Sequence, residues 1–351
     1  MSLTPDTIRV VITGGAGQIA YSLIPLISKG LVFGPTTSID LRLLDIEPAM
    51  NALKGVVMEI QDGSYDLIDR VTAHTDENMA FKDADVGILL GGYPRKQGME
   101  RYDLIEKNVR IMRLHGRAIE NHASRDCKVL VVANPANTNC LVAMKYAPSI
   151  PTSNFTALTR LDHDRLKGML AAKIKTSPQN TFKFTVKNIR NHIIWGNHSG
   201  SQVPDTSHAE VNVDGTWMPV RPLCHDDAWL DNGLISKVQQ RGSEIIAARK
   251  LSSAMSAANA IANHIIDWFA YVPPEKGMLS MSVLSDGNTY GIPNGLVFSF
   301  PVRCGKKSYS IVPDLSIDSK VRAMLDRTVE ELLEEKKLAE SIIGVQQESC
   351  L

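Results

Sequence analysis

A glycine-rich turn that directly follows an apolar segment places the strongest constraint on the fold. Residues Ile8–Thr13 have the composition of a buried strand, and Gly-Gly-Ala-Gly-Gln-Ile-Ala follows at positions 14–20. Gly14 permits a tight turn, and Gly17 lets backbone amides approach a pyrophosphate at the start of a helix. Ala20 allows that helix to pack closely on the sheet. A plain strand-to-helix turn would use the same glycines, so the surrounding residues have to separate the two interpretations.

The first part of the chain alternates apolar strands with helical stretches. We expect strands at Ile8–Thr13, Asp40–Leu44, Val86–Leu90 and Val129–Ala133. Their continuous apolar runs are typical of strands buried on both faces, which occur in a parallel sheet covered by helices. The pattern predicts an α/β fold in which residues 1–154 form an N-terminal doubly wound parallel-sheet (Rossmann) domain.

The pattern changes near residue 155 and favours a mixed α+β substrate domain over residues 155–351. Short strands, hairpin signals and long helical stretches occur there without regular alternation. The expected elements are strands at Phe155–Leu158 and His192–Trp195, a hairpin of Glu210–Val213 and Met218–Val220 around Asp214-Gly215, a long helical stretch over 232–270, and a hairpin-like region over 297–311.

A terminal helix is expected from about Ser316. Asp318 or Ser319 would cap its N-terminus. Acidic and basic residues mix along it, which is typical of a solvated face with ion pairs between neighbouring turns. The residues assigned to that face are Glu330, Glu331, Glu334, Glu335, Lys336 and Lys337.

The charge balance gives no support to nucleic acid or an anionic membrane as a partner. Lysine plus arginine and aspartate plus glutamate are equal, at 38 each. No apolar run is long enough to span a bilayer. The N-terminus has neither the pattern of a secretory signal nor that of a transit peptide. We therefore expect a cytoplasmic protein.

The cysteines are scattered and odd in number, which suits reduced thiols better than a disulfide framework or a zinc site. The histidines also lack a metal-ligand spacing, and we expect no metal. The cysteines are Cys127, Cys140, Cys224, Cys304 and Cys350.

An acidic residue at the end of the second expected strand strengthens the nucleotide interpretation of the glycine turn. Asp45 closes this strand in the sequence Leu-Leu-Asp-Ile. A carboxylate there accepts hydrogen bonds from an adenosine ribose and repels a 2′-phosphate, so the sequence favours NAD over NADP. Its separation from Gly17 is longer than usual, which predicts an extended first crossover around Gly30–Ser38.

Two short motifs in the second half supply the groups needed to oxidise a 2-hydroxy acid. They are Arg-Leu-Asp-His-Asp-Arg at 160–165 and Trp-Gly-Asn-His at 195–198. His198 can accept the hydroxyl proton, and Asp162 can hold the imidazole in the required tautomer. Arg165 can grip a substrate carboxylate with its fork of N–H donors.

A loop rich in cations follows the third expected strand. It runs from Pro94 to Arg101 and also contains Arg95 and Gly98. Such a pair of arginines is often mere surface charge. This loop, however, leaves the carboxyl end of a parallel strand, where folds of this class bind their ligands. A cationic loop at that edge can close on a dianion and exclude water.

These motifs together make the chain resemble the cytosolic-type malate dehydrogenases of the lactate/malate dehydrogenase superfamily. The resemblance runs nearly end to end, and an ordered series of motifs is more diagnostic than any one of them. It is carried by Thr13–Ser22, Leu44–Met50, Pro94–Asn108, Val131–Asn139, Leu158–Arg165, Ile194–Ser199, Gln239–Gly242 and Arg249–Ala258.

The resemblance implies a dicarboxylate substrate, malate or oxaloacetate, and assigns its contacts. Arg95 would hold the distal carboxylate, where lactate dehydrogenases have an uncharged residue. Arg101 would polarise the reacting carbonyl, and Arg165 would bind the carboxylate next to it. Asn134 would hydrogen-bond the reacting oxygen. Ser253 would lie beside the nicotinamide and the substrate.

The resemblance also implies a homodimer and a set of NAD contacts. His115 departs from the family, which often has glutamine at this position near the cofactor. The implied NAD-binding residues are Gly14, Gly15, Ala16, Gly17, Gln18, Ile19, Ala20, Asp45, Asn108, His115, Val132 and Asn134.

The implied reaction transfers a hydride from C2 of malate to NAD and the hydroxyl proton to neutral His198. Asp162 would stabilise the imidazolium and raise the pKa of His198 above about 6.5. One segment is longer than the family pattern predicts, around Ser177–Asn191, and we interpret it as a surface excursion because loop extensions are energetically cheap.

Two other functions remain open at this point. A dehydrogenase for lactate or an aromatic 2-hydroxy acid is disfavoured by Arg95, because a guanidinium facing an apolar substrate end would be unpaired. A catalytically silent NAD-binding protein on the same fold is disfavoured because every expected proton-transfer and carboxylate-binding position has a competent residue.

Overall fold

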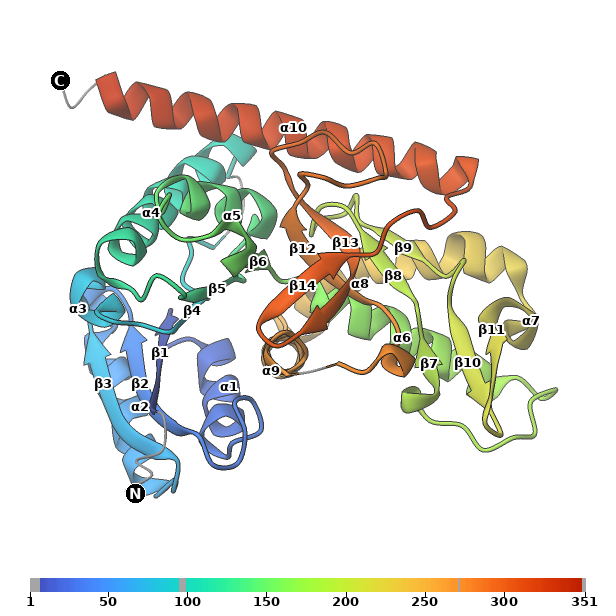
Figure 1. Cartoon of the computed structure of the whole chain (residues 1–351), viewed down its shortest axis with the longest axis horizontal. Coiled ribbons are helices and arrows are strands. Elements are labelled where there is room, and N and C mark those ends of the chain that lie inside the picture. Colours follow the sequence, from blue (N-terminus) through green and yellow to red (C-terminus); the bar gives the residue numbers. More distant parts are fainter. Residues whose placement is uncertain (1–6, 95–98, 271, 349–351) are drawn as a thin grey trace. The chain divides into compact units, whose positions relative to one another are not determined.

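The computed structural model describes residues 7–94, 99–270 and 272–348. The chain divides into two compact units, each built from separate stretches of sequence (Figure 1). The first unit comprises Met1–Leu158, Ala254–Ile266 and Leu332–Leu351, and the second comprises Thr159–Ser253 and Asp267–Glu331.

The first unit contains a parallel sheet in the order β6-β5-β4-β1-β2-β3. The strand order reverses at β1, as in doubly wound sheets, so the predicted fold class is confirmed. Predicted and observed strand ends differ by a residue or two. The bounds are β1 Thr7–Thr13, β2 Ser38–Leu44, β3 Ile68–His74, β4 Val86–Leu89, β5 Lys128–Val131 and β6 Phe155–Ala157.

The strand β3 was not predicted from the sequence. Its polar residues alternate with apolar ones, and most of its side chains are only half-buried. It is the last strand in the order, so one of its two edges pairs with no other strand of this sheet. An edge strand therefore lacks the continuous apolar run on which the other assignments depended.

Helices alternate with these strands along the chain. The extended crossover predicted around Gly30–Ser38 is present, since residues 29–37 connect α1 to β2. The bounds in the first part of the chain are α1 Gln18–Ser28, η1 Glu47–Ala49, α2 Met50–Asp62, α3 Glu77–Phe81, α4 Arg101–His122, α5 Ala136–Lys145 and η2 Thr152–Asn154.

The second unit combines antiparallel strands with helices, which confirms the predicted α+β class. Its strands form three groups, β12-β13-β14, β11-β10-β7 and β8-β9. Both predicted hairpins are present. The bounds are β7 Ile189–Arg190, β8 Ile193–Trp195, β9 Val203–Asp205, β10 Glu210–Val213, β11 Thr216–Pro219, β12 Leu279–Leu284, β13 Val297–Gly305 and β14 Ser308–Ile311.

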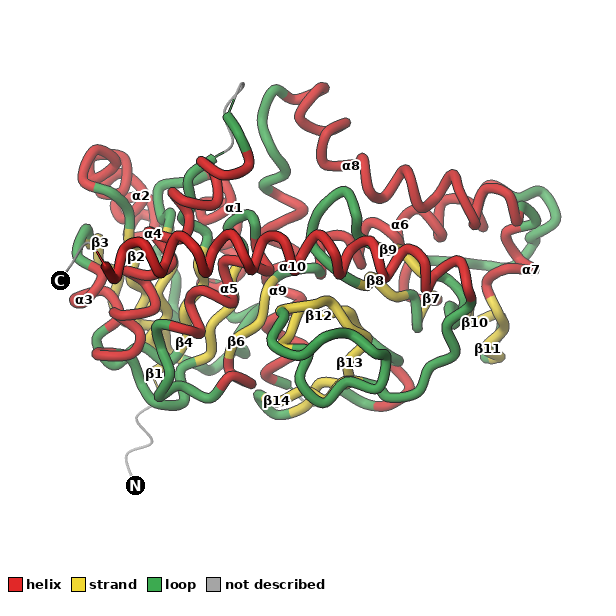
Figure 2. The backbone as a smooth tube through the Cα atoms, turned by 90° about the horizontal axis from the view of Figure 1, so that it is seen from above, coloured by secondary structure: helices red, strands yellow, loops and turns green. Residues whose placement is uncertain are grey.

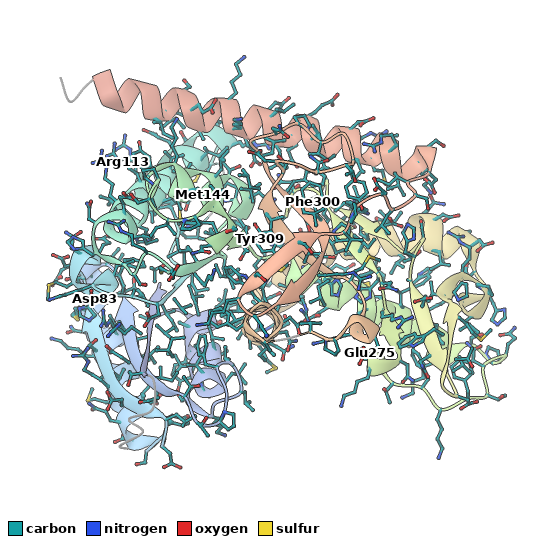
Figure 3. All side chains as sticks on the ribbon, in the orientation of Figure 1. Asp83, Arg113, Met144, Glu275, Phe300 and Tyr309 are labelled. Carbon is teal, nitrogen blue, oxygen red and sulfur yellow. The ribbon has the colours of Figure 1, made fainter. Side chains whose placement is uncertain are left out.

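Aromatic side chains form part of the core of this unit. Phe300 on β13, labelled in Figure 3, packs against Trp195 and Tyr290. The remaining helices belong wholly or partly to the second unit, and α9 and α10 each contain residues of both units. Their bounds are α6 Arg160–Thr176, η3 Val186–Asn188, α7 Val220–Cys224, η4 Trp229–Gly233, α8 Leu234–Arg249, α9 Met255–Phe269, η5 Pro274–Lys276 and α10 Ser319–Glu348.

The prediction of one long helical stretch over 232–270 is wrong. The helix α8 ends at Arg249, where Lys250 adopts the left-handed conformation at φ +62°, and α9 begins at Met255. The backbone amide of Lys250 donates to Ile246 O, which closes the end of α8. No glycine or proline marks this break, so the sequence pattern did not reveal it.

The segment interpreted as a surface excursion is partly incorporated in the fold. Phe182 and Phe184 pack against the hydrophobic core of the second unit. Asn180 donates to the carbonyls of Ile174 and Leu223 at 2.9 Å. Ile189–Arg190 is the edge strand β7, which pairs with β10. The interpretation is therefore wrong for these residues, because this segment supplies apolar side chains to the core and a paired strand.

The four cysteines within the described residues are buried free thiols, while Cys350 lies outside them. Across the described ranges, none of the helices is long and apolar enough to cross a membrane. The terminal helix α10 is one continuous helix (Figure 2), and Asp318 caps it as predicted by accepting from the backbone amide of Val321 at 2.7 Å.

Candidate active site

The first turns of α6 carry two of the predicted catalytic side chains. Thr159 is the N-cap residue, and its carbonyl accepts from the backbone amide of Asp162 at 3.1 Å. Asp162 therefore lies in the first turn, where the helix dipole favours a carboxylate. Arg165 follows three residues later and lies on the same face of the helix.

Asp162 connects the other two members of the predicted set. Its Oδ2 accepts a hydrogen bond from Nδ1 of His198, and its Oδ1 accepts one from Nη1 of Arg165 at 3.0 Å. The Asp162 side chain is completely buried. Because Nδ1 of His198 carries the bond to Asp162, proton exchange with a ligand falls to Nε2.

The charges of this cluster shift the pKa values of both acid–base groups. Burial opposes protonation of His198, but the adjacent charge of Asp162 and its hydrogen bond outweigh burial and raise the pKa of His198 above 6.5. Burial alone would raise the pKa of Asp162, yet His198, Arg165 and Gln202 together lower it. The cluster therefore favours an ionised carboxylate beside a histidine that protonates readily.

Ser253 contacts Arg165. Its Oγ accepts a hydrogen bond from Nη2 of Arg165 at 3.1 Å. Asp162 and Ser253 thus fix one terminal nitrogen each, and each of these nitrogens has a second N–H. The guanidinium is thus held in one orientation and keeps N–H donors that can bind a carboxylate.

His198 lies on the turn between β8 and β9. Gly196 opens this turn at φ +91° and exchanges two backbone hydrogen bonds with Ser299, at 3.1 and 2.9 Å. A Cβ on Gly196 would lie 2.5 Å from the methyl group of Thr328, so only glycine fits. The sequence motif Trp-Gly-Asn-His therefore includes a position next to Asn197 and His198 that only glycine can occupy.

The glycine turn in the first unit has the shape expected of a phosphate-binding turn. Gly14 adopts φ +68°, and a Cβ there would lie 2.9 Å from the backbone nitrogen of Gly91. A Cβ on Gly15 would lie 2.9 Å from Leu43 and Leu53. Gly17, which is exposed, is the N-cap residue of α1. The turn thus presents the exposed N-terminus of α1, which fits a pyrophosphate.

The rest of this motif forms the first turn of α1 and differs in exposure. Gln18 is exposed, Ile19 is half-buried and Ala20 is completely buried. Only a small side chain at Ala20 lets the helix pack closely, as expected from the sequence.

Asp45 follows the end of β2 and contacts the glycine turn directly. Its Oδ2 accepts from the backbone amide of Ala16 at 3.0 Å, and its Oδ1 accepts from the amide of Ile46 at 2.8 Å. The carboxylate therefore lies beside the phosphate-binding turn. This position fits an acid that reads the adenosine ribose of a dinucleotide.

Asn108 is completely buried, and its amide is used inside the protein. Its Oδ1 accepts from the backbone amide of Tyr93 at 2.9 Å, while its Nδ2 donates to the carbonyls of Tyr93 and Leu104. These bonds tie α4 to the segment after β4. The structure thus gives Asn108 a role in holding this backbone, in addition to the implied cofactor contact.

His115 lies in the core of the first unit, near Phe81. Burial lowers the pKa of His115 to about 4, so the imidazole is neutral near pH 7. Val132 is half-buried and Asn134 is exposed, both just after β5. The backbone amide of Val132 donates to Leu89 O at 3.0 Å, which fixes the start of this loop.

Of the two arginines in the loop after β4, only Arg101 lies within the described residues. Arg95 lies outside the described residues. Arg101 is the first residue of α4, and its Nη2 donates to Oε1 of Glu335 at 2.7 Å. Glu335 is only 4% exposed and also accepts a hydrogen bond from the Thr138 hydroxyl.

The assignment of Glu331 and Glu335 to a solvated face is therefore wrong. Glu335 is buried, and Glu331 is half-buried with its carboxylate bonded to the turn that carries His198. The sequence did carry a signal that Glu335 and Thr328 are buried. Both occupy positions in a stripe of otherwise apolar residues whose spacings alternate between four and three. That stripe consists of Val321, Leu325, Thr328, Leu332, Glu335, Ala339 and Ile342.

Two family domains match the chain. The lactate/malate dehydrogenase NAD binding domain matches residues 8–156, and the lactate/malate dehydrogenase alpha/beta C-terminal domain matches residues 159–343. The chain belongs to the lactate/malate dehydrogenase family. This confirms the predicted resemblance, the fold class and NAD as the cofactor of this oxidoreductase.

Relatives within the lactate/malate dehydrogenase family match nearly the whole chain. The cytoplasmic malate dehydrogenase of Medicago sativa is 48% identical over 342 residues, which cover 97% of this chain and 100% of that protein. A malate dehydrogenase structure from Naegleria fowleri has a TM-score of 0.88 at 41% identity, covering 96% of this chain and 98% of that one. A Trichomonas vaginalis lactate dehydrogenase structure, in complex with NADH and oxamate, has a TM-score of 0.89 at 34% identity, covering 96% and 99%.

Proposed function

We propose that this protein catalyses the NAD-dependent oxidation of (S)-malate to oxaloacetate and the reverse reaction. The observation that carries the proposal is the cluster of His198, Asp162 and Arg165, in which one buried carboxylate orients both a proton acceptor and a carboxylate-binding guanidinium. The relatives named malate dehydrogenase support the choice of substrate within the family.

His198 is the proposed proton acceptor and donor. In malate oxidation, Nε2 of the neutral imidazole takes the proton of the C2 hydroxyl. The imidazolium that forms is stabilised by ionised Asp162 through Nδ1. In oxaloacetate reduction, the protonated imidazole returns the proton to the oxygen. Asp162 remains ionised throughout, because its pKa is lowered by the cations around it.

Three arginines are proposed to hold the dianion. Arg165, fixed by Asp162 and Ser253, binds the carboxylate beside the reacting carbon. Arg95 binds the distal carboxylate and so selects a dicarboxylate, and Arg101 polarises the reacting carbonyl. Asn134 hydrogen-bonds the reacting oxygen.

NAD, when bound, supplies the acceptor for the hydride that leaves C2 of malate. The glycine turn at 14–20 and the N-terminus of α1 would hold its pyrophosphate. Asp45 would bind the adenosine ribose and disfavour a 2′-phosphate. Asn108, His115, Val132 and Asn134 complete the proposed cofactor contacts.

We further propose a cytoplasmic homodimer with its domain boundary at 154/155. The relatives named cytoplasmic support the compartment. The homodimer is proposed from the family resemblance. Analytical ultracentrifugation at micromolar concentration tests the oligomeric state, and a monomer there would remove this part of the proposal.

A lactate-type dehydrogenase is the second candidate, because a lactate dehydrogenase shares the fold at 34% identity. The 48% identity to a malate dehydrogenase favours the first. Replacing His198 with asparagine tests the common mechanism. Turnover should fall about 10²-fold or more while NADH binding, measured by fluorescence, is retained. Unchanged turnover would contradict the assignment of His198.

A further inference from the structure

The turn that carries His198 is held by one carboxylate from the terminal helix. Oε2 of Glu331 accepts a hydrogen bond from Nδ2 of Asn197 at 3.1 Å and one from Oγ of Ser199 at 2.6 Å. It also accepts one from the hydroxyl of Ser201. Two of these partners are the residues immediately before and after His198.

Thr328, one turn earlier on α10, holds the same segment through its hydroxyl. Its Oγ1 accepts from the backbone amide of Asn197 at 2.9 Å and hydrogen-bonds Oγ of Ser201 at 2.8 Å. Thr328 is completely buried, and Gly196 packs against its methyl group. The backbone and the side chains on both sides of His198 are therefore fixed to one face of α10.

Within the turn, the two serines also lie close together, and a backbone amide links them. Ser199 Oγ lies 3.0 Å from Ser201 Oγ and accepts from the backbone amide of Ser201 at 3.0 Å. An ionised carboxylate is the strongest common acceptor for such a set of neutral donors. An amide oxygen in its place would accept from the same donors without the negative charge. The arrangement therefore uses the charge of Glu331 to hold three donors at once.

We propose that Glu331 is a positioning residue for proton transfer, in that its carboxylate holds the turn on which His198 meets Asp162. The proposal rests on the proposed function of His198. Proton transfer depends on distances that are held to a fraction of an ångström, so a loosened turn lowers the rate without removing any group that touches substrate.

The location of Glu331 separates this role from a general contribution to stability. Its carboxylate bonds to the side chains that flank His198, whereas Glu334, on the same helix, is exposed. A helix that only packed against the turn would be insensitive to the charge of this one side chain. The predicted consequence is a change at His198 itself.

The test compares Glu331→Ala and Glu331→Gln with the matched controls Glu334→Ala and Glu334→Gln. Oxaloacetate reduction is measured from pH 6 to 9, NADH affinity is measured by fluorescence, and the titration of His198 is followed by NMR of histidine-labelled protein. A Thr328→Val variant removes the hydroxyl that bonds Asn197 and Ser201 while keeping the side-chain shape. If Glu331→Ala does not fold, the comparison uses Glu331→Gln and Thr328→Val.

Glu331→Ala should lower kcat about tenfold to a hundredfold, with the KM for oxaloacetate and the NADH affinity within about twofold of the parent values. The His198 titration should move to lower pH, because its contact with Asp162 is weakened. Glu331→Gln should recover part of both effects, Thr328→Val should show smaller changes in the same direction, and the Glu334 variants should match the parent protein.

A Glu331→Ala protein with unchanged kcat and unchanged His198 titration would overturn the proposal. So would a loss of kcat equal to that of Glu334→Ala. Failure of the proposed function is distinguishable, because the parent protein would then not reduce oxaloacetate. In that case the NMR titration still decides, since a shifted His198 titration in Glu331→Ala supports the positioning role of Glu331 and an unchanged one overturns it.

Discussion

The imidazole of His198 donates through Nδ1 to the carboxylate of Asp162, which is completely buried. A buried anion with few other partners binds a cation strongly, and here the partner becomes a cation only when it is protonated. The contact therefore couples the charge state of His198 to its position. It also explains why the same carboxylate bonds Arg165, since two positive groups offset the desolvation of one negative group.

Replacing Asp162 with asparagine should move the pH dependence of oxaloacetate reduction to lower pH. In the proposed mechanism, reduction needs protonated His198, so the parent activity should persist above pH 6.5 and fall as pH rises through the raised pKa of this histidine. Without the carboxylate charge, burial and Arg165 both lower that pKa. We expect kcat at pH 7.5 to fall about 10²-fold or more. An unchanged pH profile would contradict this coupling.

Replacing Arg165 with lysine should raise the KM for oxaloacetate about 10²-fold, because an ammonium group cannot make two parallel bonds to a carboxylate. Replacing Ser253 with alanine should have a milder effect, about several-fold, since it removes only one of the bonds that orient the guanidinium. Steady-state kinetics with saturating NADH measure both. An unchanged KM in the Arg165→Lys protein would show that Arg165 does not bind substrate.

A double-mutant cycle of Arg101→Ala and Glu335→Gln should show coupling in the free energy of unfolding. The two side chains form an ion pair at 2.7 Å, with the carboxylate buried and 45% of the Arg101 side chain exposed. Solvent screens the arginine, so the coupling should be about 1 kcal/mol. Urea denaturation of the four proteins gives this value. Additive effects would mean that the pair does not contribute to stability.

Replacing His192 with phenylalanine should make the protein less sensitive to acid. The rings of His192 and His163 lie 3.8 Å apart, and neither nitrogen of His192 has a partner at hydrogen-bonding geometry among the described residues. Burial first, and then the charges of Lys167 and Arg160, lower the pKa of His192 well below 6.5. The unfolded chain therefore binds more protons below pH 6.5.

The stability contributed by neutral His192 is fully present above about pH 6.5 and is lost as pH falls toward the lowered pKa. The slope for one such group is at most about 1.4 kcal/mol per pH unit. Urea unfolding at pH 7.5 and pH 5 should show a smaller loss for His192→Phe than for the parent protein. The exposed His122→Phe is the matched control. An equal loss in all three proteins would rule out this role.

The sequence predicted best what depends on local spacing. Asp162 and Arg165 lie three residues apart on one helix, so their shared face followed from the motif alone. The glycine turn and Asp45 were similarly predicted from the end of an apolar strand. The edge strand β3 was not predicted because it has no continuous apolar run. The break at Lys250 was not predicted because no glycine or proline marks it.

The contacts of the terminal helix were not predicted. Asn197 and Glu331 are 134 positions apart in the sequence, so their contact leaves no local pattern. Glutamates on a helix with many charges are also usually assigned to its solvent-exposed face. The available signal was Thr328 and Glu335 in a stripe of otherwise apolar residues. Such a signal indicates buried polar groups, but the partners of those groups follow only from the tertiary structure.

The most direct test of the account measures NADH oxidation by the purified protein with oxaloacetate, pyruvate and phenylpyruvate, repeated with NADPH. We predict fast oxidation of NADH with oxaloacetate and little with the other combinations, because the proposal assigns selection of a dicarboxylate to Arg95 and repulsion of a 2′-phosphate to Asp45. Faster oxidation with pyruvate or phenylpyruvate would contradict the proposed substrate, and equal use of NADPH would contradict the role of Asp45.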